Sequence, residues 1–174
     1  MSPVDLVVRR LEETDDRRGF RSGDLALDLF FERYAGQNQF RLGIGITYVV
    51  AAGPRLVGYM TVAGATIHGA ELPAKLRKRF PAYPLPVVRV ARLAVHGDAQ
   101  NRGVGAALLR HACALAHRQA RDVGCVGIIV DAKAGARTFY ERFGFAVMPA
   151  LAGELDVPAH PQPMFLPMGR IPSE

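Results

Sequence analysis

The chain contains the stretch RVARLAV (residues 89–95), which runs directly into HGDAQNRGVG (residues 96–105). The first stretch continues an apolar, valine-rich run and predicts a strand. Beyond it, apolar residues recur at helical spacing and predict a helix that ends near residue 120. These residues are Val104, Leu108, Ala112 and Leu115. The stretch therefore predicts a strand, a glycine-containing turn and a helix in direct succession.

The turn combines three features that favour a phosphate ligand. Gly103 and Gly105 let the backbone approach a ligand closely. The start of a helix presents unpaired N–H groups and the positive end of the dipole, and Arg102 adds a guanidinium beside them. A Rossmann dinucleotide turn fits less well, because Leu108 stands where that motif needs a small residue. The turn therefore predicts a pyrophosphate site.

The segments before the turn predict strands and one helix. GITYVVAA (residues 45–52) and RLVGYMTVAGATI (residues 55–67) predict an antiparallel hairpin closed by Gly53-Pro54. Residues 6–10 predict a short first strand. A helix follows, with Ser22 or Asp24 as its cap. Its apolar residues recur at i, i+3, i+4 and i+7 as Leu27, Phe30, Phe31 and Tyr34.

The segments after the turn alternate between strand and helix patterns. CVGIIVDA (residues 125–132) predicts a buried strand, and residues 135–143 predict a helix that ends at Gly144. Residues 145–148 and 164–168 predict final strands, with a proline-rich loop between them. The basic segment 73–81 predicts a short helix or turn. This order indicates an α/β sheet of mixed direction.

Length and composition bound the class of protein. A chain of 174 residues and 18.9 kDa with 49% apolar residues predicts one domain, residues 1–174. Arg110 interrupts the best apolar stretch, and the N-terminus is too charged for a secretory signal, so we expect a cytoplasmic protein without a membrane span. The two cysteines and scattered histidines predict no metal site.

Positive charge is concentrated in one part of the sequence. The net charge is +6, and residues 75–92 hold six basic residues and no acidic one. They are Lys75, Arg77, Lys78, Arg79, Arg89 and Arg92. The segment is either an ordinary solvated face or a patch for a polyanion such as a nucleic acid or a phosphorylated cofactor.

Three motifs in order resemble the GNAT acetyltransferase superfamily. QNRGVG (residues 100–105) matches its Q/R-x-x-G-x-G/A motif, which binds the acetyl-CoA pyrophosphate. RLAV (residues 92–95) matches its pantetheine strand, and TFYERFGF (residues 138–145) its later helix. The resemblance implies the GNAT fold, a mixed and mostly antiparallel central sheet flanked by helices, with acetyl-CoA as acetyl donor and no metal. It implies cofactor contacts at Leu93, Ala94, Val95, Gln100, Asn101, Arg102, Gly103, Val104, Gly105 and Ala106.

From about residue 6 to residue 168, the chain further resembles the tRNA-acetylating GNAT toxins of the TacT and AtaT type. This resemblance implies that the substrate is aminoacyl-tRNA, that acetylation blocks translation, and that a ribbon-helix-helix antitoxin binds the chain. A homodimer is also implied. Ser22 replaces the cysteine of many relatives, and residues 150–163 carry no clear family signature.

The motif residues match the chemistry of acetyl transfer. Tyr140 matches the family's tyrosine near the thioester sulfur, and its phenol is able to protonate the leaving thiolate. Backbone N–H groups near Ala94 or Val95 would stabilise the oxyanion. We expect Glu141 to be solvated, and Asp131 to cap the next helix or hold Lys133. Without a base, an α-amine is favoured over lysine, because about 10–15% of it is neutral at pH 7.

The basic segment then has a function in RNA binding. We expect Arg77, Lys78, Arg79, Arg89 and Arg92 to contact tRNA, with Arg89 and Arg92 on opposite faces of their strand and Arg92 nearer the active site. Two alternatives stay open at this point. One is a GNAT enzyme that acetylates a small amine or a protein N-terminus, and the other is a CoA-binding module without activity.

Overall fold

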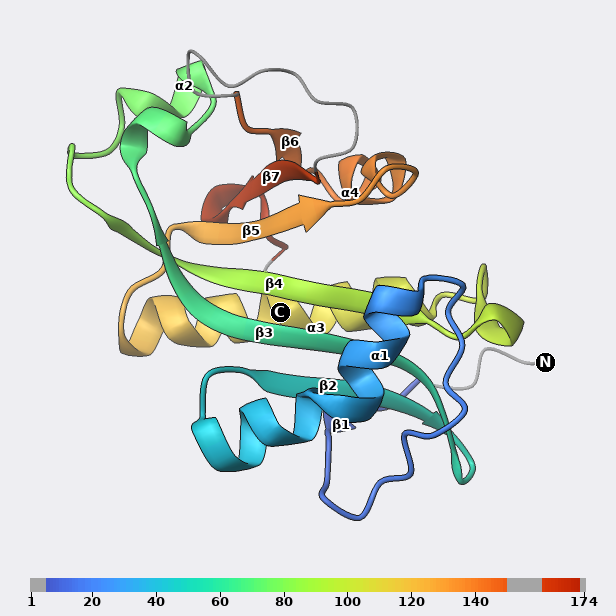
Figure 1. Ribbon diagram of the computed structural model, residues 1–174. Coiled ribbons are helices and arrows are strands. Elements are labelled where there is room, and N and C mark those ends of the chain that lie inside the picture. Colours follow the sequence, from blue (N-terminus) through green and yellow to red (C-terminus); the bar gives the residue numbers. More distant parts are fainter. Residues whose placement is uncertain (1–5, 150–160, 173–174) are drawn as a thin grey trace. The chain divides into compact units, whose positions relative to one another are not determined.

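The computed structural model describes residues 6–149 and 161–172 (Figure 1). The chain divides into two compact units, residues 1–63 with 90–112 and residues 64–89 with 113–174. Three elements continue from one unit into the other: β3 (Arg55–Ile67), β4 (Leu85–Val95) and α3 (Val104–Asp122). Hydrogen-bonded strands follow the order β1 (Val8–Arg10), β2 (Ile46–Ala52), β3, β4, β5 (Gly127–Ala132), β7 (Gln162–Pro167) and β6 (Ala146–Val147).

The first unit is built on an antiparallel hairpin. β2 (Ile46–Ala52) pairs antiparallel with β3, with Ile46 opposite Val62. β1 (Val8–Arg10) pairs antiparallel with the other edge of β2. Gly53 in the connecting turn has a φ of 61°, a left-handed conformation that favours glycine. The predicted hairpin and first strand are confirmed.

Helix α1 (Leu25–Arg33) covers this hairpin with aromatic side chains. The Asp24 carboxylate accepts from the N–H groups of Ala26 and Leu27 at 3.0 and 3.2 Å, so Asp24 rather than Ser22 is the N-cap. The buried Phe31 ring stacks on the Tyr59 ring of β3, with 4.3 Å between the ring centres. The Tyr59 hydroxyl donates to the Leu27 carbonyl at 2.6 Å, and burial raises its pKa. These contacts hold α1 on β3.

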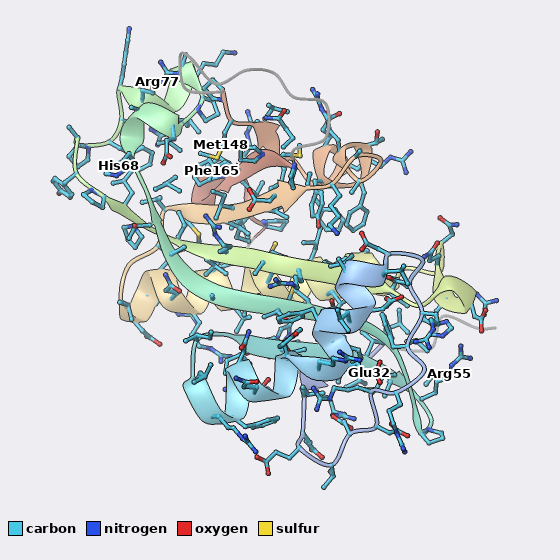
Figure 2. The ribbon with its side chains drawn as sticks, viewed as in Figure 1. Glu32, Arg55, His68, Arg77, Met148 and Phe165 are labelled. Atoms are coloured by element: carbon cyan, nitrogen blue, oxygen red, sulfur yellow. The ribbon has the colours of Figure 1, made fainter. Side chains whose placement is uncertain are left out.

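The second unit contains the C-terminal strands and two short helices, α2 (Ala74–Arg77) and α4 (Arg137–Arg142). β5 (Gly127–Ala132) and β6 (Ala146–Val147) both pair antiparallel with β7 (Gln162–Pro167). A side chain at Gly127 would collide with the Leu166 carbonyl and the Phe165 ring, so glycine allows this pairing. Phe165 and Met148 lie together in the core of the unit (Figure 2).

The mixed α/β class with a mostly antiparallel sheet flanked by helices is confirmed. The predicted helix at residues 135–143 is shorter, because residues 133–136 form a turn, and Tyr34 follows α1 and is exposed. A π-helical segment (Gln37–Leu42) was not predicted. Most of the predicted loop, residues 150–160, lies outside the described residues. Within the described part, no helix has the length and apolar character needed to cross a membrane.

Candidate active site

In the first unit, the turn at residues 96–103 joins β4 to α3 and precedes three backbone donors that lack an acceptor within the helix. Asn101 and Gly103 have left-handed φ values of 62° and 84°. The first intrahelical bond runs from the Ala107 N–H to the Gly103 carbonyl at 3.0 Å. The N–H groups of Val104, Gly105 and Ala106 therefore have no acceptor within the helix. They are donors of the kind that an anion at a helix N-terminus uses.

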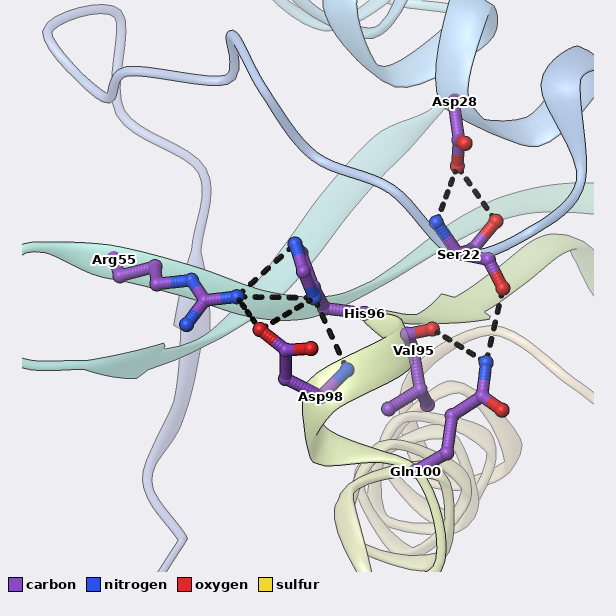
Figure 3. Close-up of polar contacts among 7 residues, drawn as sticks. All are labelled: Ser22, Asp28, Arg55, Val95, His96, Asp98 and Gln100. Carbon is purple, nitrogen blue, oxygen red and sulfur yellow. Dashed lines mark hydrogen bonds and ion pairs between the residues drawn. The ribbon is translucent and has the colours of Figure 1, made fainter.

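Contacts from remote segments hold this turn in place (Figure 3). The Gly97 N–H donates to the Arg21 carbonyl at 2.8 Å. The Arg55 guanidinium donates to the Asp98 carboxylate at 2.7 Å and lowers the pKa of that carboxyl group. His96 accepts from the Asp98 N–H at 3.3 Å, which caps the short 3-10 turn (Gly97–Ala99). These hydrogen bonds and the ion pair therefore fix the conformation of the turn.

The residues predicted to bind the cofactor differ in their exposure and in the groups they can offer to a ligand. The Gln100 amide donates to the carbonyls of Ser22 at 2.9 Å and Val95 at 3.2 Å. Asn101 and Arg102 are exposed. On β4, Leu93 and Val95 are partly buried, whereas the Ala94 side chain is 4% exposed and belongs to the core. Backbone groups are therefore what Ala94 offers a ligand.

Sequence reasoning missed Gly58, which brings α3 close to β3. A Cβ at this position would lie 2.5 Å from Cγ1 of Val104, the first residue of α3. No side chain fits without moving the start of the helix. The signal that could have found it is a glycine inside a strongly apolar strand, which often marks a close approach of another segment.

In the second unit, the end of α4 positions Tyr140. The Phe145 N–H donates to the Tyr140 carbonyl at 3.2 Å, and the Gly144 N–H donates to the Glu141 carbonyl at 3.0 Å. This is a Schellman motif, and Gly144 adopts the left-handed φ of 97° that it requires. The Phe145 ring packs edge-on against the Tyr140 ring, with 5.5 Å between the ring centres. The predicted glycine stop is confirmed, and it holds Tyr140 from both backbone and side chain.

The Tyr140 side chain is buried, and its hydroxyl has no hydrogen-bond partner among the described residues. Its side chain is 5% exposed, and burial raises the pKa to about 12. Among residues 6–149 and 161–172, the structure gives this hydroxyl no hydrogen bond. The phenol is protonated at neutral pH and its donor is available.

The predicted RNA-binding residues fall into two groups. Arg77, Lys78 and Arg79 are exposed at and after α2, although the Arg77 Nε donates to the Leu72 carbonyl at 2.9 Å (Figure 2). The two arginines of β4 have different partners. Arg89 pairs with Asp131 at 3.6 Å, and the Arg92 guanidinium lies 3.8 Å from the centre of the Phe30 ring.

The carboxylates of Asp131 and Glu141 are both engaged. Asp131 forms an ion pair with Arg89, a partner that was not predicted, because β4 brings that guanidinium to the end of β5. Glu141 pairs with Arg137 at 2.6 Å across one helical turn and is exposed, as expected. Neither is an unpaired base.

Two features of the structure fit acetyl-CoA. The turn before α3 offers three backbone donors and the exposed Arg102 to a pyrophosphate. The Tyr140 side chain is buried, and its hydroxyl is a donor with no acceptor among the described residues. In the described residues, no three His, Cys, Asp or Glu side chains are grouped to hold a metal ion.

Known proteins share this fold and these motifs. The Acetyltransferase (GNAT) domain matches residues 43–147, more than half of the chain. A tRNA-acetylating toxin from Mycobacterium tuberculosis is 34% identical over 142 residues, which is 81% of this chain and 84% of that protein.

Two solved structures are similar over nearly the whole chain. AtaT complexed with acetyl-methionyl-tRNAfMet has a TM-score of 0.83 and 28% identity, with 96% of this chain and 97% of that chain covered. A mutant AtaT toxin bound to the C-terminus of the antitoxin AtaR and acetyl-CoA has a TM-score of 0.74 and 25% identity, with 97% and 96% covered. From the domain match and the 34% identity, the chain belongs to the GNAT acetyltransferase family.

Proposed function

We propose that this chain is an acetyl-CoA-dependent N-acetyltransferase that acetylates the amino group of aminoacyl-tRNA and thereby blocks translation, as the toxin of a toxin–antitoxin pair. The observation that carries the proposal is the likeness, over 96% of the chain, to a toxin complexed with acetyl-methionyl-tRNAfMet. The 34% identity to a tRNA-acetylating toxin supports the same substrate class.

The chain's own groups fit the donor. Acetyl-CoA, when bound, supplies an acetyl group activated as a thioester. The N–H groups of Val104, Gly105 and Ala106, with Arg102, bind the pyrophosphate at the start of α3. Leu93, Ala94 and Val95 offer the backbone of β4 to the pantetheine arm, and Gln100, Asn101 and Gly103 shape the turn between.

Tyr140 acts as the general acid. Its hydroxyl donates a proton to the departing sulfur as the carbon–sulfur bond breaks and the bond from carbon to the amine nitrogen forms. The phenolate then recovers a proton through water, balancing the proton that the amine loses. Because burial raises the pKa to about 12, the proton is in place throughout the neutral range.

The acceptor is an α-amine on RNA. Asp131 and Glu141 are both ion-paired, so the chain offers no free base at these positions, and an amine that is partly neutral at pH 7 needs none. The exposed Lys78 and Arg79, together with Arg77, Arg89 and Arg92, provide positive charge for RNA phosphates.

The remaining expectations are part of the same proposal. Residues 1–174 act as one GNAT domain in the cytoplasm, in which β3, β4 and α3 join the two units. A ribbon-helix-helix antitoxin neutralises the chain, consistent with the antitoxin bound to the AtaT mutant. The active form is a homodimer, and light scattering is expected to give twice the 18.9 kDa chain mass.

The test is acetyl transfer from labelled acetyl-CoA to bulk aminoacyl-tRNA, with deacylated tRNA, small amines and peptides in parallel. Label on charged tRNA alone, released with the amino acid by mild base, is the expected result. Label on amines or peptides but not on charged tRNA would retain the donor and overturn the acceptor. The basic segment would then be an ordinary solvated face.

A further inference from the structure

A continuous chain of hydrogen bonds runs from α1 to the turn before α3 (Figure 3). The Asp28 carboxylate accepts from the Ser22 N–H at 3.0 Å and from the Ser22 hydroxyl at 2.6 Å. The Ser22 carbonyl accepts from the Gln100 amide at 2.9 Å, and the same nitrogen donates to the Val95 carbonyl at 3.2 Å. Residues 78 positions apart are thus joined inside the first unit.

The Gln100 amide is committed to the protein. Its nitrogen has two N–H groups, and each is directed at a carbonyl oxygen, of Ser22 and of Val95. Rotating the amide by 180° would place its oxygen against both carbonyls, so the two acceptors determine its orientation. The side chain cannot donate to a phosphate without giving up these bonds. Gln100 therefore acts on a ligand through the turn.

The segment that accepts from Gln100 is itself held. Asp28 is 7% exposed, and both Ser22 donors converge on one of its oxygens. The neighbouring Arg21 carbonyl accepts from the Gly97 N–H at 2.8 Å. Two consecutive carbonyls thus receive donors from the turn at residues 96–103.

The cap of α1 does not account for these bonds. Asp24 already accepts from two of the free N–H groups in the first turn of that helix, those of Ala26 and Leu27. The Asp28–Ser22 bonds therefore add a tie between α1 and the segment before it, and Gln100 and Gly97 extend that tie to the turn.

We infer that Ser22 and Asp28 are positioning residues for the turn that binds the CoA pyrophosphate, acting through Gln100. This inference rests on the proposed function. Removing either link lets the turn move relative to β4, so the three backbone donors at the start of α3 no longer share one geometry. The loss falls on the nucleotide half of the donor, because the pantetheine half is bound by β4 itself.

The experiment compares two acetyl donors and one direct binding measurement. Ser22→Ala, Asp28→Asn and Gln100→Met are each assayed with acetyl-CoA and with S-acetylpantetheine, which lacks the pyrophosphate. Binding of CoA is measured by calorimetry without any acceptor. Gln119→Met is the matched control, because its amide also donates to a carbonyl, that of Gly124, at the far end of α3.

We expect Ser22→Ala and Gln100→Met to raise the KM for acetyl-CoA and the Kd for CoA about fivefold. The KM for S-acetylpantetheine and kcat at saturation should stay within about twofold of wild type. The double variant Ser22→Ala/Gln100→Met should have the same KM for acetyl-CoA as Gln100→Met alone, because both substitutions break the same path of hydrogen bonds. Gln119→Met should leave the ratio of the two KM values unchanged.

Other outcomes separate this inference from the proposed function. Equal increases in KM for both donors would show general loosening and overturn the positioning role, as would unchanged CoA binding in Ser22→Ala and Gln100→Met. If Asp28→Asn melts at the assay temperature, Ser22→Ala decides alone, because Ser22 is only partly buried. Wild-type chain that binds CoA but leaves charged tRNA unmodified overturns the acceptor and spares the inference. Wild-type chain that binds no CoA overturns both.

Discussion

The Tyr140 side chain is buried and its hydroxyl has no hydrogen bond among the described residues, which predicts a large effect on turnover and a small one on stability. Tyr140→Phe should lower kcat about a hundredfold or more, because the leaving sulfur loses its acid. The free energy of unfolding of the variant should lie within about 1 kcal/mol of the wild-type value, because the hydroxyl has no hydrogen bond among the described residues. Stopped assays, calorimetry with CoA and urea unfolding measure the three quantities.

The matched control is Tyr83→Phe, since Tyr83 is 65% exposed and lies outside the three motifs. It should change neither kcat nor stability. Turnover by Tyr140→Phe at the wild-type rate would remove Tyr140 as the acid. A stability loss above about 1 kcal/mol would reveal a hydrogen bond made by its hydroxyl.

Asp15 predicts a pH-dependent contribution to stability. It accepts two bonds from Arg9, both at 2.8 Å, and these lower its pKa below the ordinary 3.8. A carboxyl with a lowered folded pKa stabilises above its unfolded pKa, and that stabilisation is lost as pH falls through the folded value. Asp15→Asn should therefore cost about 1 kcal/mol at pH 7, after allowance for solvent screening, and progressively less below about pH 4.

Urea unfolding of wild type and variant at several pH values measures this effect. Asp16→Asn is the control, because the Asp16–Arg18 pair is exposed to solvent and its removal should change the free energy of unfolding less than Asp15→Asn does. A cost for Asp15→Asn that is the same at pH 7 and pH 3 would show that the ionised carboxylate is not its source.

At the scale of elements, the Schellman motif of α4 links backbone conformation to Tyr140. Gly144→Ala should cost about 1–2 kcal/mol, because alanine at a φ of 97° is strained. Its Cβ would also lie 3.3 Å from a Leu166 methyl group. Because the same motif holds the Tyr140 carbonyl and packs Phe145 on its ring, we expect kcat to fall about tenfold as well.

Gly43→Ala separates the two effects. Gly43 has a φ of 64° and open space around it, and it ends the π-helical segment far along the chain from Tyr140. It should lose stability without losing kcat at a temperature where both variants are folded. Equal losses of kcat in both variants would contradict the link between Gly144 and Tyr140.

At the scale of the whole molecule, the charge of +6 predicts RNA binding that weakens with salt. Lys78 and Arg79 are the best residues to change, because both are exposed and their substitution tests charge alone. Arg77 also donates a hydrogen bond to the Leu72 carbonyl, so its substitution would affect the fold as well. Reversing both to Glu should weaken tRNA binding and reduce the slope of log K against log salt by about 2. Filter binding at several salt concentrations measures the slope.

The matched control reverses Arg118 and Arg121, two exposed arginines on α3, with the same change in net charge. Its slope should change less. An unchanged slope after reversal of Lys78 and Arg79 would place the RNA contact elsewhere on the chain.

Residues close together in the sequence determined much of the secondary structure of this protein. The β2–β3 hairpin, the turn before α3, the course of α3 and the glycine stop after α4 depend on residues close together in sequence, so spacing and turn glycines predicted them. The motifs QNRGVG and TFYERFGF pointed to the donor site through their resemblance to the GNAT superfamily. The π-helical segment (Gln37–Leu42) was not predicted, because its polar residues carry neither a period-2 nor a period-3.6 pattern.

Only the tertiary structure decided how the functional side chains are used. Gln100 donates to a carbonyl 78 residues away, Arg89 pairs with Asp131, and Arg92 lies on Phe30. The Tyr140 side chain is buried. Each depends on segments that meet only when the sheet assembles. The amino-acid sequence by itself therefore determined the fold class and the motifs, because these follow from near neighbours. Packing between distant segments decided the hydrogen-bond partners and the burial that sets the pKa of Tyr140.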